Sequence, residues 1–124
     1  CKQNKMNDAQ IQNAAGKIVQ PSDEADNASA ESANWKTSFY KILTNLQGAQ
    51  AWPISGATFI LMQASQDKPE KAAGALKFFK WSMTNGDKQA DALDYVPLPK
   101  DVKDVIEASW KKIKDTSGKP VAYK

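Results

Sequence analysis

The chain has 124 residues, of which 41% are hydrophobic and 25% charged, with a formal net charge of +3. A chain of this length supports one domain and argues against two complete ones, and its ordinary composition excludes a fibrous or disordered protein. All 17 basic residues are lysine and there is no histidine. The chain therefore lacks guanidinium clamps for anions and the commonest acid, base and metal ligand near neutral pH. Nucleic-acid binding is not expected, because the 14 interspersed carboxylates leave no concentrated basic surface.

The first 33 residues contain weak strand signals followed by a helix signal. Ile11 and the Ile18-Val19 pair lie on either side of Gly16, which predicts two short strands joined by a turn. Ser22 is a suitable N-cap for a helix over residues 23–33, and acidic residues occupy its first turn. Because the apolar positions of this helix are nearly all alanine, we expect a surface helix that buries little.

The middle of the chain has one ambiguous segment and one strongly apolar one. The spacing of the apolar residues in 34–50 is ambiguous and fits either a helix or a strand. The stretch "AWPISGATFILM", residues 51–62, ends in an almost unbroken apolar run from Ala57 to Met62. Such a run predicts a strand buried on both faces. Pro53 cannot donate to a β-ladder, so it belongs at the entrance of that strand, and Gly56 suggests a kink or a close backbone approach.

Two amphipathic helices are predicted in the last third. Residues 69–86 begin with a proline suited to the first helical position and end at Asn85-Gly86, with an apolar face formed by Ala72, Leu76, Phe79 and Met83. A short helix is expected at 87–93. Residues 99–114 form the second long helix, ended by Gly118 and Pro120, with an apolar face formed by Val102, Val105, Ile106, Trp110 and Ile113.

These elements predict the α/β class, with one buried central strand followed by amphipathic helices. The chain supplies too few other strong strands to build the sheet that this strand needs. Either a partner completes the sheet, or the segment is part of a larger chain.

Residues with catalytic or ligand-binding chemistry are few. Two acidic clusters at helical spacing could form a hard-metal site or an acid/base pair, but interleaved lysines favour a solvated helix face; the clusters are Asp87, Asp91 and Asp94, and Asp101, Asp104 and Glu107. The four tryptophans could stack on sugars or bases, although core packing is the better interpretation; they are Trp35, Trp52, Trp81 and Trp110. Neither a GxSxG nor a GxxxxGK[ST] motif occurs. We therefore expect no enzyme, no cofactor and no metal.

Several ordered stretches carry a family resemblance: "KQNKM", "NWKTSFYKILTN", "AWPISGATFILM", "KPEKAAGALKFFKWSMTNGDKQADALDYVPLP" and "IKDTSGKP". Together they resemble the carboxy-terminal part of the periplasmic phosphate-binding proteins of bacterial phosphate ABC transporters, the PstS type. The resemblance covers essentially the whole chain and about the last third of the family's usual length.

The resemblance implies the C-terminal portion of a two-lobed periplasmic-binding-protein fold of type II, which closes on its ligand around a hinge. Residues 1–50 would end the second lobe, 51–56 would cross between the lobes, and 57–124 would return to the first lobe with a central strand and helices. The hinge residues implied are Trp52, Pro53, Ile54 and Ser55.

The family binds phosphate through backbone N–H groups at helix N-termini, Ser and Thr hydroxyls, an arginine and an aspartate. The resemblance places all these ligands upstream, so no phosphate-binding residue is expected in this segment, and neither Ser55 nor Thr58 is a family ligand position. Selectivity between phosphate and a related oxyanion such as arsenate is not predicted, because it depends on those ligands.

For the full-length protein the resemblance implies inorganic phosphate and a membrane permease as partners, and a periplasmic or extracytoplasmic, membrane-associated location. No apolar stretch approaches the ~18 residues that a membrane span needs. The single cysteine, Cys1, cannot form an internal disulfide. It could be the lipidated first residue of a bacterial lipoprotein. The resemblance argues against this, because it places Cys1 well inside the family's mature protein, and it favours a start through truncation, proteolysis or design.

An alternative function involves no small-molecule ligand. The chain could be a stand-alone module that self-associates or binds another protein, with a homodimer formed through exposed apolar surface.

Overall fold

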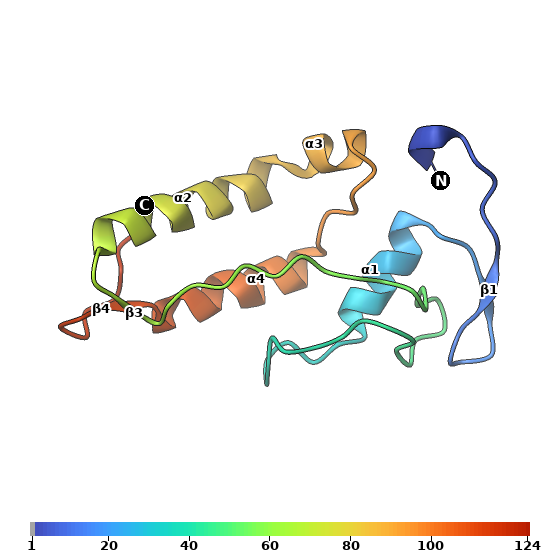
Figure 1. Ribbon diagram of the computed structural model, residues 1–124. Helices are drawn as coiled ribbons and strands as arrows, with labels where there is room; N and C mark the ends of the chain where they lie inside the picture. Colours follow the sequence, from blue (N-terminus) through green and yellow to red (C-terminus); the bar gives the residue numbers. More distant parts are fainter. Residues whose placement is uncertain (1) are drawn as a thin grey trace.

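The computed structural model describes residues 2–124 and combines helices with short strands, as the α/β class predicts (Figure 1). Cys1, on which the lipoprotein interpretation depends, lies outside the described residues. The elements follow in this order: η1 (Lys2–Asn4), β1 (Ile11–Gln12), β2 (Ile18–Val19), α1 (Asp23–Glu31), β3 (Ser65–Gln66), α2 (Pro69–Asn85), α3 (Asp87–Ala92), α4 (Lys100–Ser109), η2 (Trp110–Lys112) and β4 (Lys114–Asp115).

The N-terminal hairpin and α1 form where the sequence predicts them. β1 and β2 pair antiparallel, with Ile11 opposite Val19, across a turn in which Gly16 has a positive φ of 75°. The Ser22 hydroxyl accepts a hydrogen bond from the Ala25 N–H at 3.2 Å and so caps α1.

The prediction that α1 buries little is wrong. Ala25, Ser29 and Ala30 are all buried, and Ser29 is fully so. Small side chains add little apolar area each, but they allow a neighbouring backbone to approach closely. The small-residue face of α1 therefore forms a contact surface for the backbone of Trp52.

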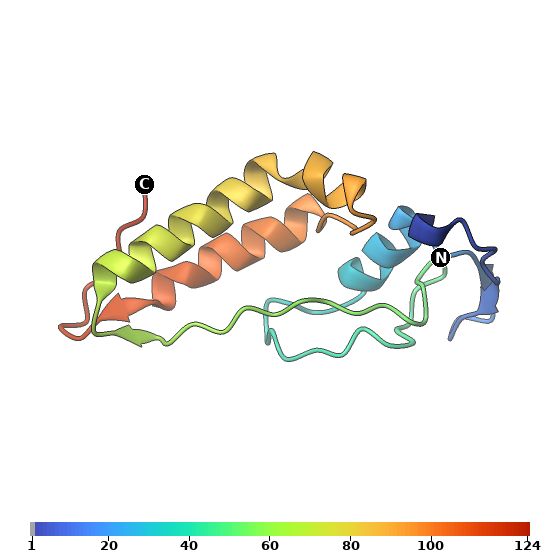
Figure 2. The same cartoon turned by 45° about the horizontal axis from the view of Figure 1, so that its top comes forward.

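Helices α2 and α4 lie side by side and antiparallel (Figure 2). Leu76 of α2 is fully buried at the centre of a core cluster that also contains Ala72, Trp110, Ile113 and Val121. A second cluster joins Val102 of α4 to Ala33, Trp35 and Leu43. Helix α4 therefore contacts both the C-terminal helices and the segment that follows α1.

The ends of α2 follow its sequence signals. Pro69 occupies the first turn, where a missing N–H has no cost. At the other end, the N–H of Gly86 donates to the Ser82 carbonyl at 2.8 Å. A Cβ at Gly86 would lie 2.4 Å from that same oxygen, so a close backbone approach requires glycine here. The short helix α3 then begins directly, as predicted.

Helix α4 is shorter than predicted. It ends at Ser109 and tightens into η2, and Ile113 is already extended. β4 then pairs parallel with β3, with Ser65 opposite Lys114. Gly118, with a φ of 86°, lies in the following turn, which brings Pro120 back against Lys114. Gly118 and Pro120 thus shape a turn after the helix and do not end the helix itself.

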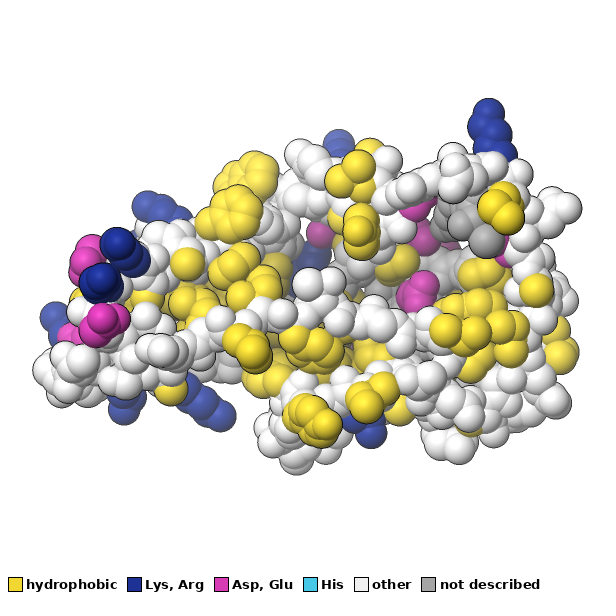
Figure 3. Space-filling view, viewed as in Figure 1, with side chains coloured by type: hydrophobic (Ala, Val, Ile, Leu, Met, Phe, Trp, Pro, Cys, Tyr) yellow, Lys and Arg dark blue, Asp and Glu magenta, His cyan; other side chains and the backbone are white. Residues whose placement is uncertain are grey.

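The prediction of a buried strand at residues 57–62 is wrong for this chain. The segment is extended but has no ladder partner among residues 2–124. Its side chains are largely exposed, with exposed fractions of 50% for Phe59, 58% for Ile60 and 94% for Leu61. A strand is buried on both faces only inside a sheet, and the described residues form only two sheets, each of two-residue strands. Hydrophobic side chains consequently gather on the surface of this face (Figure 3).

Residues 34–50, whose period was ambiguous, contain no regular helix or strand in the structure. Their only pairing in the described chain is an isolated antiparallel bridge between Thr44 and Ile54. The core-packing interpretation of the tryptophans is confirmed for Trp35 and Trp110, which are buried. It is wrong for Trp81, which is 55% exposed.

Candidate functional site

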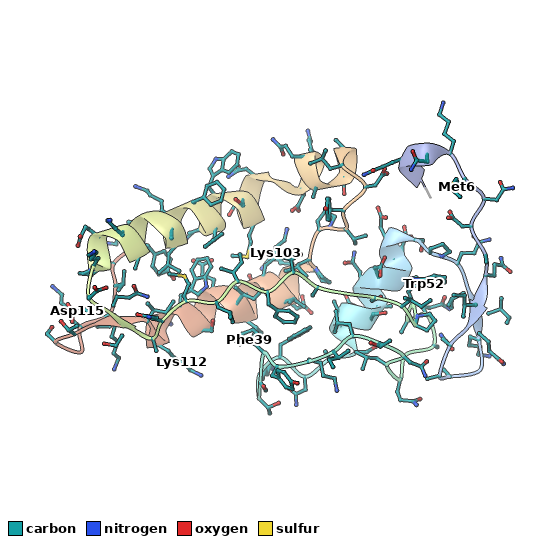
Figure 4. The ribbon with its side chains drawn as sticks, in the orientation of Figure 1. Met6, Phe39, Trp52, Lys103, Lys112 and Asp115 are labelled. Carbon is teal, nitrogen blue, oxygen red and sulfur yellow. The ribbon has the colours of Figure 1, made fainter. Side chains whose placement is uncertain are left out.

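The predicted hinge residues lie against α1 and are bound to it through the backbone of Trp52 (Figure 4). The Trp52 N–H donates to the Ala25 carbonyl at 2.9 Å, and the Ser29 hydroxyl donates to the Trp52 carbonyl at 2.8 Å. Both peptide groups of Trp52 are thus held by one face of one helix. This contact explains why α1 carries small residues where it buries surface.

Ser55 adds a second connection to α1. Its hydroxyl lies 2.6 Å from Asp26 Oδ1 and 3.1 Å from the Trp52 carbonyl. The hydroxyl has one hydrogen to donate, and the short distance assigns it to the carboxylate. Because Asp26 belongs to α1, this hydrogen bond fixes Ser55 to that helix.

The four predicted hinge residues do not share one environment. Pro53 is buried and its carbonyl accepts a hydrogen bond from the Asn45 N–H at 2.9 Å. Trp52 and Ser55 are half-buried, whereas Ile54 is 66% exposed. Trp52 and Ser55 are therefore bonded to α1, Pro53 is bonded to Asn45, and the side chain of Ile54 is left largely exposed.

Asn13 holds the residues just before Trp52, and the sequence did not identify it as a site residue. Its side chain is buried, and its Nδ2 lies 3.0 to 3.2 Å from the carbonyl oxygens of Gly48, Ala49 and Ala51. Its Oδ1 accepts from the N–H groups of Ala15 and Lys17 at 3.1 and 3.0 Å. One amide therefore joins the β1–β2 turn to the chain just before Trp52. An asparagine three residues before a glycine turn was the available sequence signal.

Comparison with known proteins gives this geometry its context. No family model matches the chain. Over 110 residues it is 46% identical to the phosphate-binding protein PstS of Xylella fastidiosa strain 9a5c, which covers 87% of this chain. It is 44% identical over 112 residues to the protein of the same name from Haemophilus influenzae and 42% identical over 121 residues to that from Pasteurella multocida, which cover 89% and 95% of this chain.

This chain matches the PstS family of phosphate-binding proteins. It spans about a third of the length of the curated relatives it matches, with shares of 30%, 34% and 35%. These relatives are phosphate-binding proteins by name. None of the helices in residues 2–124 combines the length and apolar character that crossing a bilayer requires.

A groove of about 340 Å³ lies between α2 and α4, and its lysines and carboxylates are equal partners in ion pairs. Three lysines in it each pair with a carboxylate: Lys80 with Glu107 at 2.6 Å, Lys100 with Asp104 at 2.5 Å and Lys103 with Asp87 at 2.7 Å. The hydrogen bond that Lys80 donates to Glu107 raises the pKa of Lys80, and the one that Lys100 donates to Asp104 raises the pKa of Lys100. Because every lysine here already has an anionic partner, the groove does not offer phosphate an uncompensated cation.

The aspartates of the two acidic clusters lie on the surface, exposed to solvent. Asp87 and Asp104 are exposed and bound to lysines, while Asp91, Asp94 and Asp101 are exposed. Across the described chain, no group of three or more His, Cys, Asp or Glu side chains could hold a metal ion. Their exposure and their ion pairs with lysines therefore favour the solvated-face interpretation.

Proposed function

We propose that this chain forms a segment of the phosphate-binding component of an ABC transporter and supplies crossing and core elements rather than phosphate ligands. The observation that carries the proposal is the identity of 42 to 46% over 87 to 95% of the chain to proteins named for phosphate binding. The match covers only 30 to 35% of those relatives. The remaining two thirds of such a protein would hold the phosphate ligands.

The chemistry of the described residues supports ligands located elsewhere. A dehydrated oxyanion needs several free donors directed at one point. The groove lysines are paired with carboxylates, and the Ser55 hydroxyl binds Asp26. Thr58 is exposed on an extended segment, without neighbouring donors that would complete a site.

In the proposed two-lobed type II fold, residues 1–50 end the second lobe and 57–124 return to the first, with Trp52, Pro53, Ile54 and Ser55 in the crossing. The bonds to Ala25, Asp26 and Ser29 make the first part of the crossing move with α1. Rotation between lobes would then take place from Gly56 onward. There a Cβ would meet nothing within 4 Å, and the next residues make no ladder.

The proposal extends to partners and location. The permease of the transporter and an extracytoplasmic location belong to the complete protein, because phosphate must be captured before it crosses the membrane. In that protein, residues 57–62 would be covered by neighbouring strands from outside this chain, which accounts for their apolar composition.

Phosphate titration of the chain tests the proposal, followed calorimetrically with and without the remaining part of the Haemophilus influenzae PstS protein. We expect no submillimolar binding by the chain alone and restored binding by the mixture. Submillimolar binding by the chain alone would show that the ligands are here after all. A mixture that forms a complex and still fails to bind phosphate would also contradict the proposed role.

A second candidate is a self-associating module without a small-molecule ligand. The exposure of Phe59, Ile60 and Leu61 favours it, because contiguous apolar surface on a soluble chain marks an interaction site.

A further inference from the structure

The end of α2 contains a pair of residues that is chemically labile in an unfolded chain. Of the seven asparagines in the sequence, only Asn85 precedes a glycine. In such a pair the glycine nitrogen attacks the asparagine Cγ, ammonia leaves and a cyclic succinimide forms, because glycine has no side chain to hinder the attack. Water then opens the ring to aspartate or isoaspartate, so that an amide and water become a carboxylate and ammonium.

The fold requires the glycine of this pair. A Cβ at Gly86 would lie 2.4 Å from the Ser82 carbonyl oxygen, so any other residue would force the backbone of the last helical turn apart. The close approach that ends α2 therefore keeps a labile Asn-Gly pair in the chain.

The same turn keeps the two reacting groups apart. The Gly86 N–H, whose nitrogen would be the nucleophile, donates to the Ser82 carbonyl at 2.8 Å. The Asn85 Nδ2, which would leave as ammonia, donates to the Trp81 carbonyl at 3.2 Å. Both groups are thus bonded to the preceding turn of the helix. The attack on Cγ requires the last turn of α2 to open.

A contact to α4 closes the corner between α2 and α3, which follow one another at an angle (Figure 2). The Gly86 carbonyl accepts hydrogen bonds from the N–H groups of Gln89 and Ala90 at 3.1 and 3.0 Å. Asp87, the first residue of α3, accepts from Lys103 Nζ at 2.7 and 2.8 Å. The side chain of Lys103 is only 17% exposed. The peptide groups of Gly86 are therefore held on one side by α2 and on the other by a helix that is bound to α4.

We propose that Asn85 is a deamidation site and that the ion pair between Lys103 and Asp87 limits its rate by keeping the corner closed. Reaction proceeds only from the locally opened state in which Gly86 is released from Ser82. Deamidation to aspartate adds a negative charge to the C-terminal end of α2, where the helix dipole disfavours an anion. Isoaspartate also lengthens the backbone and displaces the Gly86 N–H. Each deamidation therefore loosens the corner irreversibly, and this inference is independent of the phosphate-binding role.

Peptide mass spectrometry of the 124-residue chain tests the site, after incubation in mildly alkaline buffer with and without unfolding concentrations of guanidinium chloride. In the unfolded chain we expect Asn85 to convert before every other asparagine. In the folded chain its conversion should be at least about tenfold slower. Asn85→Gln should remove the product and keep the helical circular dichroism, because glutamine forms the corresponding ring more slowly. Equal rates in the two conditions, or earlier conversion of another asparagine in the unfolded chain, would overturn the proposal.

Two lysine variants test the control by the ion pair. Lys103→Met removes the contact to Asp87 but keeps an unbranched apolar stem, so folded-state conversion at Asn85 should become about threefold faster. Lys100→Met is the matched control, because it removes the same charge from a pair with Asp104 that lies within α4. In guanidinium chloride both variants should react at the rate of the parent chain. Folded-state rates that are equal in the two variants would overturn the role of the ion pair.

Discussion

Replacing Asn13 by aspartate should loosen the segment just before Trp52, because the Asn13 side chain holds that segment. The amide nitrogen lies within 3.2 Å of three carbonyl oxygens, and the amide oxygen accepts two N–H groups. These opposite sets of neighbours fix the orientation of the amide. Asn13→Asp keeps the oxygen that accepts but replaces the donor with an oxygen that faces three carbonyls.

The magnitude follows from the number of bonds that the amide can make. Nδ2 has two hydrogens, so it serves two carbonyls at full strength. With the two bonds that Oδ1 accepts, four bonds of roughly 1 kcal/mol each are present. Asn13→Ala should therefore cost about 3 kcal/mol once solvent reaches part of the site. Asn13→Asp should cost at least about 3 kcal/mol at pH 7, because it adds a buried charge without a partner.

The pH dependence gives the prediction its sharpest test. Burial against carbonyl oxygens raises the folded-state pKa of the introduced carboxyl above its unfolded value of about 3.9. Below the unfolded pKa the carboxyl is neutral in both states and can donate one hydrogen bond. The deficit relative to the parent chain should thus shrink as the pH falls toward ~4 and grow as the pH rises through the raised value.

Urea unfolding at pH 7 and near pH 4, together with hydrogen exchange at Ala15 and Lys17, measures the effect. Asn34→Asp is the control, because Asn34 is exposed and the same charge change there should cost less than about 0.5 kcal/mol. The reasoning is refuted if Asn13→Asp matches this control at pH 7, or if its deficit is the same at both pH values.

Three further changes test the core, the C-terminal turn and the crossing. Leu76→Ala should cost about 3 kcal/mol in urea unfolding because it leaves a cavity in the core cluster; Leu93→Ala, at an exposed site, should cost less than about 0.5 kcal/mol. Hydrogen bonds from the side chain of Ser117 and the backbone of Lys119 lower the pKa of Asp115 below 3.8. Stability from this turn is present above the unfolded pKa and is lost as the pH falls through the folded value. NMR titration should find that Ser117→Ala moves the carboxyl back toward 3.8, and an unchanged midpoint would contradict this. Ser55→Ala should speed amide exchange at Trp52 several-fold, because it removes the bond that ties the residues after Trp52 to α1. Unchanged exchange would show that the bonds of Trp52 to Ala25 and Ser29 hold this segment without Ser55.

Local sequence signals predicted the helices well because their determinants lie within a few residues. Pro69, the spacing of Ala72 and Leu76, and the close approach at Gly86 are sufficient to start, orient and end α2. Ser22 does the same for the start of α1. The ordered stretches that resemble PstS-type proteins also need no structure, and the comparisons confirm that resemblance.

The contacts of the candidate site were less predictable because they join residues distant in the sequence. Asn13 reaches Ala51 across 38 positions, and Ser55 reaches Asp26 across 29. An asparagine or serine in a polar stretch looks the same whether it is solvated or buried in such a bridge. The hinge assignment of Trp52 to Ser55 came from the family resemblance and stays a prediction.

By itself, the sequence determined where α1 and α2 begin, the absence of arginine and histidine, and the resemblance to PstS-type proteins. Only the tertiary structure decided which residues are buried. It buries the small-residue face of α1 against Trp52, and it leaves residues 57–62 exposed although they are the most apolar run in the chain. The reason is that hydrophobicity measures the free energy gained on burial but does not supply a neighbour to be buried against. Ser29 has that neighbour within this chain and Leu61 does not.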